Sequence, residues 1–179
     1  MKNPVSSVSF SKIFKFQMMK NRNKLIPIIL FSVVLFFSCN GIYENGSELS
    51  EDVNNYIPQI SVNELKTKID SNQEFLLIDV RQAVEYESGN IEGSMLLPRG
   101  NLEFLISDSL FWEEQFMYAP EKDDEIIIYS QKGERAALAV QSLINLSFEN
   151  VKNLTGGYSA YDPNHKAEPV KKESGACGD

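Results

Sequence analysis

The sequence has few of the residues that build metal centres and disulfide scaffolds. It contains two cysteines, one histidine and one tryptophan in 179 residues. Two cysteines form at most one disulfide, and a single histidine leaves few ligands for a metal cluster. The 25 acidic residues outnumber the 17 basic ones, which argues against binding to a phosphate backbone. We therefore expect no bound metal ion, no cofactor and no nucleic-acid partner.

Acidic residues are missing from residues 1–38, which carry six basic residues and a charge of +6. The other 141 residues hold 11 basic and 25 acidic residues, a net charge of −14. Such an asymmetry indicates two segments with different fates. A hydrophobic fraction of 42% argues against a chain that is disordered throughout.

A long membrane-spanning run is also missing. The uncharged run from Leu25 to Cys39 has 15 residues, whereas a spanning helix needs about 20. A short apolar run behind a basic segment is typical of a signal peptide. Because the small residue Ser38 precedes Cys39 and a polar stretch follows, the region resembles a bacterial lipoprotein signal. In such signals the cysteine is acylated and becomes the first mature residue.

This resemblance implies a signal peptide of lipoprotein type over residues 1–38 and a polar tether over residues 39–56. The protein would then lie in the bacterial cell envelope, facing the periplasm or the exterior. Acyl chains on Cys39, palmitate among them, would hold it to a lipid bilayer, since several chains on one residue give stable anchoring. An ordinary signal peptide or an uncleaved anchor is the alternative. Translation from Met18 or Met19 would give a leader of more usual length.

Residues 57–163 alternate between strand and helix patterns. Continuous apolar runs are typical of buried parallel strands, and apolar residues repeated every three or four positions are typical of helices. This alternation predicts an α/β fold with a mostly parallel sheet. The expected strands are 57–60, 75–80, 95–97, 125–129 and 151–154, and the expected helices are 61–70, 101–118, 133–146 and a short one after residue 157.

Particular residues add detail to the prediction of two of these helices. Ser61 and Glu64 have the spacing of a capping box at the start of the first helix. The second helix is expected in two pieces, broken near residue 107. In it, Trp112, Phe111 and Phe116 are interpreted as core or helix-packing residues. Residues 164–179 are polar, and we expect a flexible tail there.

The most informative segment follows the strand at 125–129 and opens the next helix. Its first backbone N–H groups have no intrahelical partners, and the positive helix end adds to them. A glycine permits a tight loop. These features predict an anion-binding loop with the serine at its lip. Lys132 and Arg135 would add positive charge to it. A plain strand-to-helix turn capped by that serine is the alternative, and spacing alone favours it, because one glycine and two basic residues are common. The loop consists of Ser130, Gln131, Lys132, Gly133, Glu134 and Arg135.

Several motifs together resemble the rhodanese-like domain, a sulfurtransferase family. The resemblance implies a single domain over about residues 57–163, with a five-stranded, mostly parallel sheet flanked by helices. It implies that 130–135 is the active-site loop and that Asp79 and Arg81 support it structurally. The motifs are Leu77-Ile78-Asp79-Val80-Arg81, Gly89-Asn90-Ile91-Glu92-Gly93-Ser94, Leu97-Pro98, Tyr129-Ser130 with Gly133 and Arg135, and Leu154-Thr155-Gly156-Gly157-Tyr158.

In active members of this family the loop begins with a cysteine that carries a persulfide sulfur from donor to acceptor. Ser130 stands at that position here. A thiol has a pKa of about 8.5 that a positive site lowers, whereas a hydroxyl needs an adjacent base. The only histidine, His165, lies in the polar tail. We therefore expect a degenerate module that binds an anion or a partner protein, without ordinary sulfur transfer. A hydrolase that uses Ser130 is disfavoured because no base accompanies it.

One thiol remains if Cys39 is acylated. Cys177 lies in the polar tail, where it is incidental, forms an intermolecular disulfide or swings back to loop 130–135. The 15 residues from Asp162 to Cys177 would reach about 50 Å when extended. An active sulfurtransferase or thiol-redox protein that uses Cys177 is therefore the alternative function.

Overall fold

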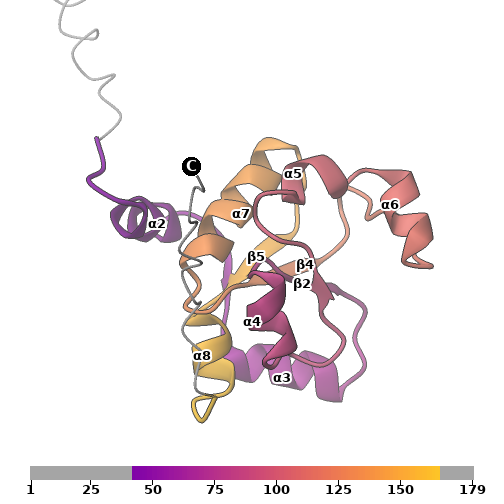
Figure 1. Ribbon diagram of the computed structural model, residues 1–179, viewed down its shortest axis with the longest axis horizontal. Coiled ribbons are helices and arrows are strands. Elements are labelled where there is room, and N and C mark those ends of the chain that lie inside the picture. The colour runs from indigo at the N-terminus through magenta and orange to yellow at the C-terminus, as the bar shows by residue number, and fades with distance from the viewer. Residues whose placement is uncertain (1–41, 166–179) are drawn as a thin grey trace, which may run out of the picture. The chain divides into compact units, whose positions relative to one another are not determined.

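The computed structural model describes residues 42–165. The predicted signal peptide at 1–38, Cys39 and Cys177 lie outside the described residues, as does the tail after His165. The described residues form a central sheet with helices on both faces (Figure 1). None of the helices in this part of the chain is long and apolar enough to span a membrane.

The sheet has five strands, and every pair of neighbours is parallel. The order across the sheet is β1-β5-β4-β2-β3, so β2 and β4 lie beside each other near its centre. This arrangement confirms the predicted α/β fold class. The strands are β1 (Gln59–Ile60), β2 (Leu76–Asp79), β3 (Met95–Leu96), β4 (Ile126–Tyr129) and β5 (Val151–Leu154).

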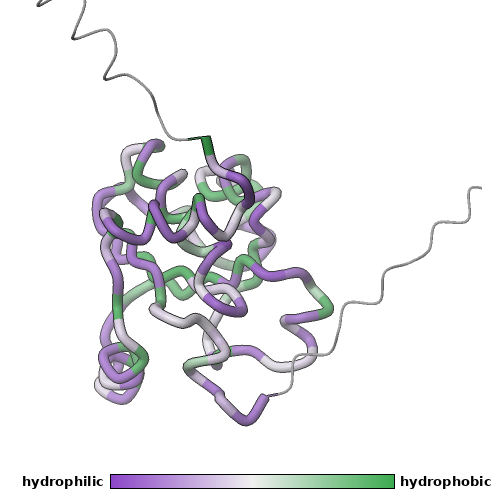
Figure 2. The backbone as a smooth tube through the Cα atoms, turned by 90° about the vertical axis from the view of Figure 1, so that its left-hand side faces the viewer, coloured by the Kyte–Doolittle hydropathy of each residue, from purple (hydrophilic) through white to green (hydrophobic). Residues whose placement is uncertain are grey.

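Each residue of β4 is buried, because helices cover both faces of the sheet. Ile126 and Ile128 pack into one apolar cluster, and Ile127 and Tyr129 pack into the other. This alternation is what a strand requires when successive side chains point to opposite faces. In Figure 2 the hydrophobic segments accordingly run through the interior of the domain.

Most helices follow the predicted alternation with the strands, and the short helix between β2 and β3 was not predicted. Ser61 and Glu64 form the expected capping box at the start of α3. The region after residue 101 forms two separate helices, as expected, and Asp108 caps the second one by accepting the Leu110 N–H. The helices are α3 (Val62–Asp70), α4 (Ala83–Glu87), α5 (Leu102–Leu105), α6 (Ser109–Glu114), α7 (Glu134–Asn145) and α8 (Gly157–Tyr161).

The segment expected to be a polar tether, residues 39–56, differs from that expectation. It contains helix α2 (Gly46–Asn54), which packs against α7 (Figure 1). The Asn45 side chain caps this helix by accepting two backbone N–H groups. Val53 is buried in the larger apolar cluster and Leu49, one turn earlier, packs against it, so two apolar positions on one face dock an otherwise polar helix.

The aromatic residues of α6 also differ in part from the prediction. Trp112 is fully buried and meets Phe111 edge-on, with 5.4 Å between the ring centroids. The packing prediction is wrong for Phe116, which is 99% exposed. Phe116 follows the end of α6 with a φ of 58°, and this left-handed backbone ends the helix before Phe116, so the helical spacing no longer places its side chain with Trp112.

Candidate functional site

Loop 130–135 connects the carboxyl end of β4 to the start of α7. Ser130 is only 1% exposed, and its hydroxyl oxygen accepts the Ala136 N–H at 3.3 Å. Within residues 42–165, the backbone N–H groups of residues 131–135 donate no hydrogen bond. The loop thus presents a row of free hydrogen-bond donors. Because an unpaired N–H group costs free energy, water or a ligand is expected to accept from these donors.

Helix α8 holds this loop in place from the other side. The Tyr158 N–H donates to the Ser130 carbonyl at 2.9 Å, and the Ser159 N–H donates to the Gln131 carbonyl at 3.0 Å. Gly157 lies so close that a Cβ there would be 2.1 Å from the Ser130 carbonyl oxygen. Its φ of 59° also lies in the left-handed region. Only glycine therefore allows α8 to approach the loop this closely.

Arg81 connects the end of β2 to the loop. Its guanidinium pairs with Asp79 at 2.7 Å, and both side chains are fully buried. It also donates to the Gly89 carbonyl at 2.7 Å and to the Gln131 side chain at 3.0 Å, and it lies over the Tyr158 ring. Burial opposes the charged form, but the hydrogen bonds and charge of Asp79 outweigh it and raise the pKa of Arg81.

Arg135 does not supply a free positive charge to the loop. Its guanidinium makes two hydrogen bonds, of 2.7 and 2.6 Å, to the carboxylate of Glu85 on α4. Glu85 also accepts the Gln82 N–H. Burial opposes its ionisation, but these hydrogen bonds outweigh burial and lower the pKa of Glu85. The loop has two basic side chains, Arg135 and the exposed Lys132, and the acidic side chains Glu85 and Glu134 offset their charge. The groups of the loop that can donate hydrogen bonds to an anion are therefore mainly backbone N–H groups.

Sequence reasoning missed the pairing of Glu85 with Arg135 because the two residues lie 50 positions apart. The spacing of Gln82 and Glu85 gave a weak signal for a helix start but none for this ion pair. His165 was also unexpected near the carboxyl edge of the sheet. Its ring meets the Tyr158 ring edge-on, 5.0 Å between centroids, and its Nε2 lies 3.4 Å from the Ser88 hydroxyl.

The structure thus brings Arg81 into contact with the predicted loop through Gln131, and Asp79 holds Arg81 in place. The remaining predicted site residues, Cys39 and Cys177, lie outside the described residues. No group of His, Cys, Asp or Glu side chains in the described part of the chain is arranged to hold a metal ion. The acidic run before β4 instead makes local contacts, as when Asp124 accepts the Glu121 N–H.

A comparison with protein families matches residues 61–163 to the rhodanese-like domain. The chain belongs to this family. The rhodanese-like domain here is 30% identical over 112 residues to the "Putative sulfur carrier protein YrkF" of Bacillus subtilis, covering 63% of this chain and 55% of that protein. It is 32% identical over 95 residues to a "Putative thiosulfate sulfurtransferase, mitochondrial" of Schizosaccharomyces pombe, covering 52% and 67%. Its homologues are thus sulfurtransferases or sulfur carriers.

Solved structures agree with this fold. The human single domain sulfurtransferase TSTD1 superimposes with a TM-score of 0.56 at 26% identity, covering 61% of this chain and 98% of that one. A protein from Rhodopseudomonas palustris of unknown function, described as a possible tyrosine phosphatase, has a TM-score of 0.57 at 24% identity, covering 73% and 98%. At that identity the second match supports the fold alone.

Proposed function

We propose that this rhodanese-like domain binds a small anion, or an acidic group of a partner protein, in loop 130–135 without ordinary thiosulfate sulfurtransferase turnover. The observation that carries this proposal is the row of N–H groups at residues 131–135, none of which donates a hydrogen bond within residues 42–165. Consecutive N–H groups at a loop leading into a helix form an anion-binding concavity.

The absence of turnover rests on placing Ser130 at the position of the family's sulfur-carrying cysteine. Oxygen does not hold an exchangeable sulfane sulfur as a thiolate does, and a serine hydroxyl needs a neighbouring base to attack. In the part of the chain that the structure describes, the hydroxyl of Ser130 contacts the Ala136 N–H and no histidine or carboxylate. Hydrolysis by Ser130 is disfavoured for the same reason.

Two measurements on the purified protein test this proposal. In an amide-resolved NMR titration with sulfate, we expect the largest shifts at residues 131–135. In a thiosulfate–cyanide assay, we expect no thiocyanate from the wild type and measurable thiocyanate from Ser130→Cys. Ser107→Cys, at an exposed serine between α5 and α6, is the matched control and should stay inactive.

Three results would contradict the proposal. Sulfate that shifts no amide of the loop would show that it is an ordinary turn. A folded Ser130→Cys variant without activity would show that the loop does not support sulfur chemistry. Wild-type activity that disappears in Cys177→Ser would favour the alternative, in which the tail supplies the thiol.

We further propose that the domain is anchored to a bilayer of the bacterial cell envelope through acylated Cys39, facing the periplasm or the exterior. The support is the basic, acid-free leader and the uncharged run that ends at Cys39. Mass spectrometry of the mature N-terminus should show an acylated Cys39, and Cys39→Ser should move the protein out of the membrane fraction. An unmodified Cys39 or a different mature N-terminus would refute the anchor.

A further inference from the structure

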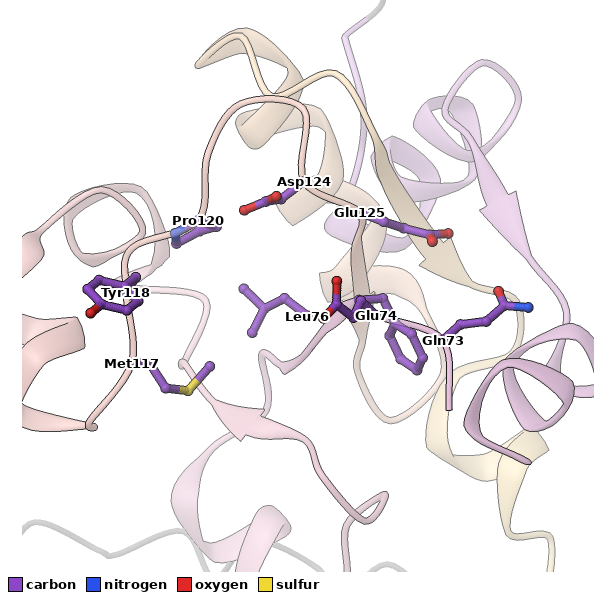
Figure 3. Close-up of a pocket in the computed structure, with 9 residues that line it drawn as sticks. Gln73, Glu74, Leu76, Met117, Tyr118, Pro120, Asp124 and Glu125 are labelled. Atoms are coloured by element: carbon purple, nitrogen blue, oxygen red, sulfur yellow. The ribbon is translucent and has the colours of Figure 1, made fainter. Parts of the chain in front are cut away.

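A cavity of about 330 Å³ opens at the amino ends of β2 and β4. Loop 130–135 follows the carboxyl end of β4, so the cavity and the loop lie at opposite ends of the strands. In Figure 3, Met117, Tyr118 and Pro120 lie on one side of the cavity and the Leu76 side chain points toward them from the other. The volume lies at the lower end of the range for ligand-binding pockets.

The segment 104–118, which reaches the cavity at Met117 and Tyr118, exposes several large apolar side chains. Among the described residues, half of the exposed large hydrophobic side chains fall between positions 104 and 118. Two of them, Met117 and Tyr118, also line the cavity. Large exposed apolar side chains with a polar rim mark a docking site more often than a polar surface does. The five residues are Phe104 (81% exposed), Leu110 (68%), Phe116 (99%), Met117 (42%) and Tyr118 (96%).

The rim of the cavity is acidic. Glu74 and Asp124 are exposed and make no ion pair within residues 42–165, and no lysine or arginine lines the cavity. Glu125, which also lines it, is already paired with Lys68 at 2.9 Å and with Lys152 at 2.7 Å on the far side. The segment 113–125 carries six acidic residues and one lysine. A cation is therefore the complement that this rim lacks.

We propose that this surface docks a segment of a partner protein in which a lysine or arginine stands between apolar side chains. The aliphatic stem of that residue would lie along Leu76 and Met117 while its charge meets Glu74 and Asp124. Neighbouring apolar side chains of the partner would cover the exposed aromatic surface. This docking is independent of anion binding at loop 130–135.

Two other occupants fit the surface less well. A second copy of this chain, related by a two-fold axis, would bring the same carboxylates against one another, which costs affinity. An anionic lipid surface would be repelled by the same acidic segment. The negative charge of the rim thus favours a basic protein segment over a second copy of the chain and over an anionic lipid surface.

Synthetic peptides test the docking directly. The probes are a capped peptide of alternating leucine and lysine and its counterpart with glutamate in place of each lysine. In NMR titrations of the purified protein, the lysine peptide should shift the amides of residues 73–76 and 117–125, and the glutamate peptide should not. The lysine peptide should also bind more weakly as salt is added, since exposed charges are screened.

Exposed positions allow variants that keep the fold. Glu74→Lys should weaken the binding of the lysine peptide by about fivefold, the upper range for an exposed ion pair. Tyr118→Ser should also weaken this binding, because apolar contact is lost. Glu51→Lys and Tyr56→Ser are the matched controls, since both residues are exposed and belong to α2 or the turn after it. Circular dichroism confirms that each variant is folded.

Four outcomes would overturn the docking proposal. The first is equal binding of both peptides, and the second is shifts that map away from the cavity. The third is concentration-dependent dimerisation that Tyr118→Ser abolishes, which would make a second copy the occupant. The fourth is binding to anionic phospholipid vesicles that Phe116→Ser abolishes, which would make a membrane the occupant.

Discussion

Replacing Gly157 by alanine tests how closely α8 must approach the site loop. At a φ of 59° an added Cβ would lie 2.1 Å from the Ser130 carbonyl oxygen and 2.7 Å from the Gly133 nitrogen. A left-handed backbone at a non-glycine residue costs about 1–2 kcal/mol, and forcing extra volume into a packed site costs about 1–3 kcal/mol more. The free energy of unfolding should therefore fall by about 2–5 kcal/mol.

Gly93→Ala separates these two contributions. Gly93 has a φ of 79°, but an added Cβ would meet nothing within 4 Å. This control should lose only the backbone contribution of about 1–2 kcal/mol. Urea unfolding, followed by the fluorescence of the single tryptophan, measures both variants. Equal losses in the two variants would refute the close contact between α8 and loop 130–135.

Two further predictions follow from buried or partly buried polar contacts. Glu85→Gln should leave Arg135 without its charged partner and strengthen sulfate binding at loop 130–135; unchanged sulfate affinity would mean that Arg135 does not influence the loop. Because the folded pKa of Glu85 is lowered, its pair stabilises the protein above the unfolded pKa of about 4.3 and is lost as the pH falls through the folded value, so wild type and variant should converge in stability at low pH. Trp112→Phe should cost about 1–3 kcal/mol in thermal unfolding, because the indole N–H donates to the carbonyls of Leu105 and Ile106; the Leu105 carbonyl still accepts the Asp108 N–H, but the Ile106 carbonyl loses its partner among the described residues. A cost near zero would mean that water replaces the indole.

The regular elements of the domain were predictable because each depends on local pattern. The apolar run of β4 and the one-sided apolar face of α7 appear directly in the sequence. The capping box of Ser61 and Glu64 is likewise a local signal. Helix α2 was not predictable, since its composition is polar and it is held by contacts with α7 that lie far away along the chain.

The candidate site was predictable as a location but not as an arrangement of charges. The sequence places Lys132 and Arg135 in the loop and suggests a positive site. Only the folded chain brings Glu85 to Arg135, and only there does Arg81 meet Gln131. Side-chain contacts between residues some 50 positions apart have no period that a single sequence reveals.

The contact between α8 and the site loop also sets an order of events during synthesis. All five strands precede residue 155, so a growing chain that ends there already contains the whole sheet. It still lacks the N–H groups of Tyr158 and Ser159, which fix the carbonyls of Ser130 and Gln131. The loop thus takes its final shape only after the last helix has been made, and a chain released early would carry the fold without a formed site.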